Sequence, residues 1–93
     1  MKRSANFLMR EVAGSWVVVP VGQAAREFSG MMRLNPTGRF LWDLLEQEQT
    51  EGSLVAALLE RYDVSEDVAS KDVAAFLEQI RSTGALDEHA NLA

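Results

Sequence analysis

Strand-like hydrophobic runs occupy the first third of this chain, and helix-like runs occupy the rest of its 93 residues. Residues 7–12 and 16–21 are rich in β-branched, aromatic and long apolar side chains, and Ala13-Gly14 separates the two runs. This pattern predicts a β-hairpin. The second run is almost continuously apolar, as in a strand covered on both faces, and Pro20 is expected at its end or at a bulge.

A polar connection over residues 22–30 leads to a third short strand, predicted at Met31–Leu34. Three helices are expected after it, because Asn35, Thr50 and Ser65 can each accept a backbone N–H as an N-cap residue. Each N-cap precedes apolar residues at helical spacing. The predicted core faces are Phe40, Leu41, Leu44 and Leu45; Leu54, Val55, Leu58, Leu59 and Tyr62; and Ala69, Val73, Phe76, Leu77 and Ile80.

The ends of the predicted helices have signals of their own. Pro36 suits the first turn of the first helix, the second helix is expected to end near Tyr62, and Gly84 supplies a left-handed stop for the third. The residues after Gly84 are expected to fold back and the polar C-terminal tail to fray. Strands followed by helices in a chain of this length predict one α+β domain, a small sheet packed on a three-helix layer.

Few of the residue types that perform catalysis or bind metals are present. The chain has no cysteine and one histidine, His89, so thiolate and histidine metal sites are excluded. It also lacks a nucleophile beside a base, paired carboxylates and a glycine-rich phosphate loop. The acidic residues Asp63, Glu66 and Asp67 are explained by the macrodipole of the third helix. We therefore expect no catalytic residue, no metal, no cofactor and no enzymatic activity.

No apolar segment approaches the roughly 20 residues that a membrane-spanning helix needs. Residues 1–12 carry positive charge, but they lack the apolar run and the cleavage site of a secretory signal peptide. We therefore expect a cytoplasmic protein that has no membrane partner.

Charge is divided unevenly along the chain. Residues 1–39 hold six basic and two acidic side chains, whereas residues 40–93 hold three basic and twelve acidic ones. The second and third predicted helices have helix-turn-helix proportions, which raises a winged-helix DNA-binding regulator as an alternative function. The candidate recognition helix, residues 65–83, holds four acids against two bases and would be repelled by phosphates. Nucleic acid is therefore a disfavoured partner.

The third predicted strand favours the binding of an extended peptide. An edge strand offers a row of backbone N–H and C=O groups, which pair with a peptide without any catalytic residue. Met31 and Met32 suit an adaptable peptide-binding surface, although ordinary core packing explains them equally well. Trp16 and Trp42 are expected to fill the core rather than to stack on a ligand. The exposed edge can also pair with a second copy, which would give a homodimer.

Several short motifs occur in an order and spacing that resemble a known family. They are Leu34-Asn35-Pro36-Thr37-Gly38, Leu41-Trp42, Leu44-Leu45, Arg61-Tyr62-Asp63-Val64, Asp72-Val73, Phe76-Leu77 and Gly84-Ala85-Leu86. Each motif is weak alone, but together they resemble the PqqD family over about residues 7–88. On that resemblance the whole chain, residues 1–93, is a single PqqD-like domain with an ordered core at about 7–88.

The resemblance implies a winged-helix-like α+β fold, with a three-stranded antiparallel sheet followed by a three-helix bundle. It also implies a RiPP recognition element, a peptide chaperone that binds the leader segment of a ribosomally made precursor peptide. Such a chaperone delivers the leader to a modifying enzyme, here a radical SAM protein or a leader peptidase or cyclase. In the family the leader adds as a further strand beside the third strand and lies against the third helix. The matching positions are Met31, Met32, Arg33 and Leu34 on the strand and Asp72, Ala75, Phe76 and Gln79 on the helix.

The first hairpin departs from that of the PqqD proteins of pyrroloquinoline quinone biosynthesis, which is more polar and richer in aromatic residues than residues 7–10 and 16–19. We therefore expect a PqqD-like protein that serves another peptide pathway. Within this hypothesis, Arg33 selects acidic leader residues through a charge-assisted contact. A structural subunit that only docks on an enzyme is a third alternative.

Overall fold

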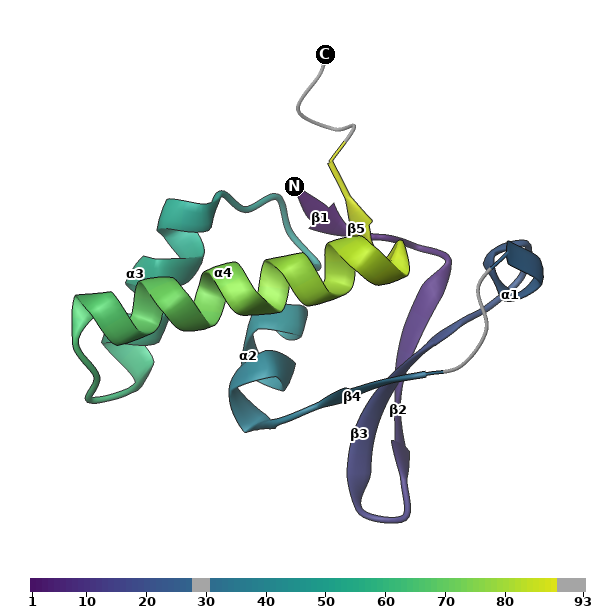
Figure 1. Cartoon of the computed structure of the whole chain (residues 1–93), viewed down its shortest axis with the longest axis horizontal. Helices are drawn as coiled ribbons and strands as arrows, with labels where there is room; N and C mark the ends of the chain where they lie inside the picture. Colours follow the sequence, from purple (N-terminus) through teal and green to yellow (C-terminus); the bar gives the residue numbers. More distant parts are fainter. Residues whose placement is uncertain (28–30, 89–93) are drawn as a thin grey trace.

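The computed structural model describes residues 1–27 and 31–88, and this part of the chain contains four helices and five strands (Figure 1). The expectations for Gly30 and for the tail with His89 fall outside the described residues. The main sheet is antiparallel in the order β2-β3-β4. Its strands are β2 (Phe7–Val12), β3 (Ser15–Pro20) and β4 (Met32–Leu34). The predicted hairpin and third strand are therefore confirmed.

The hairpin turn and both faces of β3 agree with the sequence pattern. Ala13 and Gly14 have φ angles of 52° and 81°, the pair of positive values that lets a two-residue turn match the twist of its strands. Val17 and Val18 are each 2 % exposed although they point to opposite faces, so the middle of β3 is covered on both sides. Pro20 ends the strand, as predicted.

Three longer helices follow β4, and their caps behave as predicted. They are α2 (Pro36–Leu44), α3 (Glu51–Arg61) and α4 (Glu66–Thr83). The side chains of the N-cap residues accept the N–H three residues later at 2.7, 3.0 and 3.2 Å; these caps are Asn35, Thr50 and Ser65.

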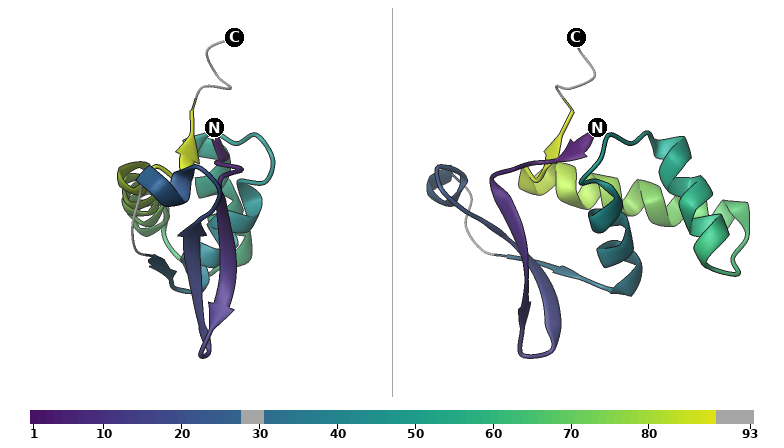
Figure 2. Two further views of the ribbon diagram at one scale, coloured as in Figure 1. Left: turned by 90° about the vertical axis from the view of Figure 1, so that its right-hand side faces the viewer. Right: turned by 180° about the vertical axis from the view of Figure 1, so that it is seen from behind.

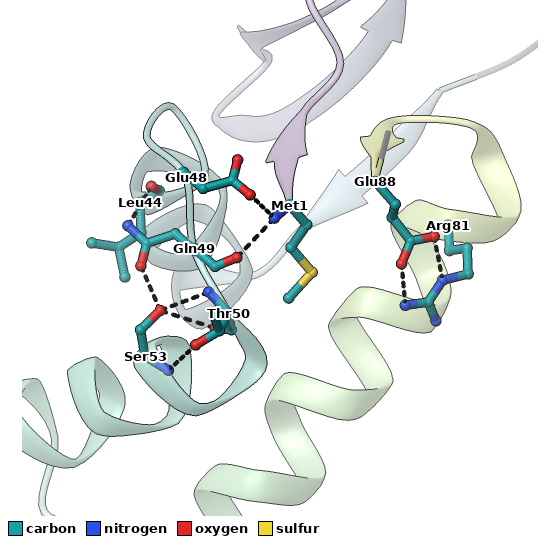
Figure 3. A network of polar contacts seen from close by, with 8 residues as sticks. All are labelled: Met1, Leu44, Glu48, Gln49, Thr50, Ser53, Arg81 and Glu88. Atoms are coloured by element: carbon teal, nitrogen blue, oxygen red, sulfur yellow. Dashed lines mark hydrogen bonds and ion pairs between the residues drawn. The ribbon is translucent and has the colours of Figure 1, made fainter. Parts of the chain in front are cut away.

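Two further cap features fix where the helices begin and end. The N–H of Thr50 donates to Ser53 Oγ at 2.9 Å and completes a capping box (Figure 3). Gly84 ends α4 in the left-handed conformation with φ 85°.

The structure differs from the predicted sheet and three-helix bundle in two respects. A fourth, short helix, α1 (Ala24–Glu27), lies inside the predicted polar connection, where Ala24 is buried. A second sheet pairs β1 (Lys2–Arg3) with β5 (Leu86–Asp87), so the chain after α4 returns to the N-terminal segment (Figure 2). Strands of two residues are too short to show an alternating pattern, so nothing in the sequence indicated this pairing.

The N-terminal segment is held by the loop between α2 and α3. The side chain of Met1 is part of the core, and its ammonium group donates to Glu48 and, at 2.9 Å, to the carbonyl oxygen of Gln49 (Figure 3). This anchor places β1 where β5 can pair with it.

The core lies between the inner face of the main sheet and the longer helices. Trp42 is 1 % exposed and fills it as predicted, whereas Trp16 is half-buried at its margin. Leu59 was predicted to face the core but is 38 % exposed, because the buried stripe of α3 is narrower than its apolar pattern. The largest fully buried side chains are Trp42, Leu41, Leu45, Leu54, Leu58, Leu77, Ile80, Val18 and Val73.

Candidate functional site

A groove of about 210 Å³ lies between α4 and the segment that joins β4 to α2. In Figure 1, α4 runs above β4, and α2 begins where β4 ends. Segments far apart in the sequence therefore form one concave surface. The lining residues are Arg33 and Leu34 on β4; Asn35, Thr37, Gly38 and Leu41 around the start of α2; and Asp72, Ala75, Phe76 and Gln79 on α4.

The structure brings six of the eight predicted site residues together in this groove and leaves two outside it. Met32 is 6 % exposed, and its side chain belongs to the core. Met31 is 63 % exposed and lies just before β4 rather than within it. The six that line the groove are Arg33, Leu34, Asp72, Ala75, Phe76 and Gln79.

The floor of the groove is apolar and depends on a glycine. Leu34 and Phe76 are each 6 % exposed, and Leu41 is fully buried. A Cβ added at Gly38 would lie 3.5 Å from Leu34 Cδ2 and 3.6 Å from Phe76 Cδ1. It would also lie 3.2 Å from Asn35 Oδ1, closer than side chains normally pack. The missing side chain at position 38 therefore lets α2 approach α4 closely.

The first turn of α2 is the wall that the sequence analysis missed. The sequence predicts a helix start at Asn35 and Pro36 and a family motif over residues 34–38, but not a binding surface, whereas Asn35, Thr37 and Gly38 all line the groove. A signal was present, because a glycine inside a helix costs stability and usually has a packing reason. Gly38 is such a residue, in the third position of α2.

The rim of the groove is polar and carries charges on both sides. Arg33 on the strand and Asp72 and Gln79 on the helix are all exposed. Neither Arg33 nor Asp72 forms an ion pair with another described residue. Both charges are therefore free to contact different side chains of one bound molecule.

The main sheet has edge strands at β2 and β4, and the edge along β4 lies beside the groove. Backbone hydrogen bonds alternate in direction along an antiparallel strand. The N–H of Val21 donates to Asn6 O at 2.8 Å, so the odd-numbered residues of this segment face β2 and the even-numbered ones face β4. Trp16 and Val18 then bond to their partners Leu34 and Met32. The backbone N–H and C=O between those partners, those of Arg33, consequently point away from the sheet at its edge.

The residues that the structure describes contain no group of three His, Asp or Glu side chains that could hold a metal, and no helix among them is long and apolar enough to cross a membrane. The pKa of Arg81 is raised, chiefly by its side-chain hydrogen bonds to Glu88 at 3.1 and 3.2 Å (Figure 3). This pair ties the end of α4 to the chain after β5 and does not line the groove.

The family model described as coenzyme PQQ synthesis protein D (PqqD) matches residues 15–86. Among solved structures, the chain is similar to one described as TbiB1 in complex with the TbiA(beta) leader peptide, with a TM-score of 0.74 and 20 % identity. The alignment covers 95 % of this chain and 96 % of that one, so the two share a fold along nearly their whole length. No curated protein matches the chain. Because the family model spans most of its residues, the chain belongs to the PqqD family.

Proposed function

We propose that this protein is a RiPP recognition element, which binds the leader segment of a precursor peptide as an added strand on β4. The observation that carries the proposal is the open edge of β4 beside a groove with an apolar floor, whose far wall is α4. Membership of the PqqD family supports it, as does the fold shared with TbiB1, a protein solved with a leader peptide.

The added strand would gain affinity from its backbone and selectivity from its side chains. The N–H and C=O of Arg33 would extend the hydrogen-bond ladder to the leader. Successive side chains of a strand point to opposite faces of the sheet. One set of leader side chains would therefore enter the groove above Leu34 and Phe76. The other set would pass the side chain of Arg33, which points to the opposite face from Leu34.

The charged rim would select the leader sequence. Arg33 has no acidic partner among the described residues, so a leader Asp or Glu beside it would form a charge-assisted hydrogen bond without displacing another. Asp72 and Gln79 on α4 would contact the side chains that enter the groove.

The protein would act by presentation and not by catalysis. Its expected partner is a modifying enzyme of the cytoplasm, a radical SAM protein or a leader peptidase or cyclase. The whole chain would work as a single domain. A second copy could also pair with the β4 edge, and a homodimer of that kind would compete with the leader.

The DNA-binding alternative is not favoured. The family match and the structural likeness point to peptide recognition. In addition, α4 holds four acidic residues and only two basic ones, Lys71 and Arg81. A helix of this charge would be repelled by the phosphate backbone.

The first test identifies the peptide and blocks the groove. Peptides captured by the full chain from the native cytoplasm are identified by mass spectrometry, synthesised and titrated by calorimetry. Ala75 is exposed and lines the groove, whereas Ala74 is exposed on the same helix and does not. Ala75→Trp should lower the affinity at least about tenfold, and Ala74→Trp should leave it unchanged. Equal affinities of the two variants would refute binding in this groove.

The second test addresses strand addition. A proline placed in the synthetic leader at the residue that pairs with Arg33 removes a backbone donor from the ladder. We expect that peptide to bind at least about tenfold more weakly, because the lost bond leaves the C=O of Arg33 unpaired. Full binding by the proline peptide would rule out the added strand even if the groove is the binding site.

A further inference from the structure

A second hollow, of about 340 Å³, lies on the opposite face of α2 from the groove. The groove uses Thr37, Gly38 and Leu41 of this helix, whereas the hollow uses Arg39, Phe40 and Asp43. At 100° per residue these two sets point in nearly opposite directions. The hollow is completed by Trp16 on β3 and by Arg61 and Tyr62 at the end of α3.

Aromatic rings and guanidinium groups form the walls of this hollow. The guanidinium carbon of Arg39 lies 3.8 Å from the centre of the Trp16 ring, and that of Arg61 lies 5.4 Å from the centre of the Tyr62 ring. Phe40 and Tyr62 pack edge to face, with their centres 5.8 Å apart. These contacts hold both cations beside an apolar surface.

The hydrogen-bond donors of the two arginines are not saturated. A guanidinium that stacks on a ring keeps its in-plane N–H groups available at its edge. The nearest acid, Asp43, has its Oδ2 4.0 Å from Arg39 Nε, which is beyond hydrogen-bond range. Arg39 Nε is buried and has no hydrogen-bond partner, so a ligand would reach Arg39 through its terminal N–H groups. Arg61 has no ion pair within residues 1–27 and 31–88.

The charges of the hollow indicate the class of ligand. Two guanidinium groups and one carboxylate give it a single excess positive charge, although the whole chain carries a net charge of −5. One excess positive charge is balanced by a single carboxylate, whereas a phosphate dianion would leave the hollow with a net charge of −1. The aromatic walls add a surface for the apolar residues next to that carboxylate.

We propose that the hollow binds an acidic side chain of a peptide segment, flanked by apolar residues, between Arg39 and Arg61. The carboxylate accepts hydrogen bonds from both guanidinium groups, and its apolar neighbours pack on Trp16 and Tyr62. This site is separate from the β4 groove, because the two lie on opposite faces of α2. It therefore does not depend on leader binding at β4.

The test uses two short probes that differ in one group. Acetyl-Leu-Glu-Leu-amide and its twin acetyl-Leu-Gln-Leu-amide are titrated into the nitrogen-15-labelled full chain. We expect the glutamate probe to shift the indole N–H signal of Trp16 saturably and the glutamine twin to bind at least about tenfold more weakly. The indole signal of Trp42, which is 1 % exposed, serves as an internal control for the fold.

Variants and a second signal separate this site from the groove. Arg61 is exposed, so Arg61→Gln should leave the fold intact and weaken the glutamate probe about tenfold. Lys71→Gln also removes one positive charge, at an exposed position on α4, and should leave the affinity for the glutamate probe unchanged. Equal binding of the two probes, no shift at Trp16, or full binding by Arg61→Gln would each overturn the proposal. Shifts at the backbone N–H of Arg33 instead would place the probe at the β4 edge and also overturn it.

Discussion

Gly38 on α2 lies directly against Phe76 on α4: a Cβ at position 38 would come within 3.6 Å of Phe76 Cδ1. This contact sets the depth of the groove, because any side chain at position 38 would rise from its floor. The glycine therefore joins the packing of two helices to the shape of the candidate binding site.

Gly52 offers a matched comparison for the packing at Gly38. It is also helical, but the nearest atom to an added Cβ is Thr50 Oγ1 at 3.8 Å. Gly52→Ala should raise the free energy of unfolding by up to about 1 kcal/mol, because alanine loses less backbone entropy in a helix. Gly38→Ala should raise the free energy of unfolding by less, since its Cβ would lie 3.2 Å from Asn35 Oδ1. Urea unfolding measures both free energies. Equal increases would show that the residues around position 38 can move to accommodate the added Cβ at no cost in stability.

Arg33 and Arg10 lie opposite Val17 from the two outer strands, on the same face of the sheet, and only Arg33 lines the groove. Arg33→Glu should weaken leader binding about tenfold, because it replaces an attractive contact with a repulsive one. Arg10→Glu makes the same change in net charge and should have a clearly smaller effect. Calorimetry at low and high salt measures both. An unchanged affinity for Arg33→Glu would show that this residue does not select the leader.

Thr50 holds the start of α3 through its capping box with Ser53. Thr50→Ala removes the side-chain acceptor and should lower the free energy of unfolding by about 1 kcal/mol. Thr50→Ser keeps the hydroxyl group and should cost much less. Both values come from urea denaturation followed by circular dichroism. A full loss in the serine variant would point to the methyl group of Thr50 instead of its hydrogen bond.

Hydrogen bonds to Glu88 raise the pKa of Arg81 above its ordinary value. A cation whose folded pKa is raised contributes stability that is fully present below its unfolded pKa and is lost only as the pH rises through the folded pKa. The drop in thermal midpoint caused by Arg81→Gln should therefore be the same throughout about pH 6 to 9. Glu78→Gln, which removes one contact of 3.3 Å to the same guanidinium, should lower the midpoint less. A drop that changes across this range would mean that another group titrates with the pair.

Local patterns accounted for most of the elements. Several of these features depend on residues within four positions of one another. They are the hairpin turn at Ala13-Gly14, the caps at Asn35 and Ser65 and the stop at Gly84. Their chemistry was therefore visible in the sequence. The short helix α1 was missed because its four residues form a single turn, which is too short to show a helical repeat of apolar residues.

The candidate site was predictable only in part. The resemblance to the PqqD family indicated the strand and the helix that form two of the groove walls. It predicted eight site residues on these elements, and six of them line the groove. It did not show that the side chain of Met32 turns into the core, since one residue of register decides which face of a strand a side chain takes.

Short-range spacing in the sequence predicts the order of the main-sheet strands and of the three longer helices, together with the positions of the helix caps. The order of the short motifs along the chain indicates the family. The tertiary structure alone decided that β1 pairs with β5, that the first turn of α2 closes the groove and that Arg39 stacks on Trp16. Each of these contacts joins residues that are distant in the chain. Their distances depend on how whole elements pack, and no local pattern encodes that packing.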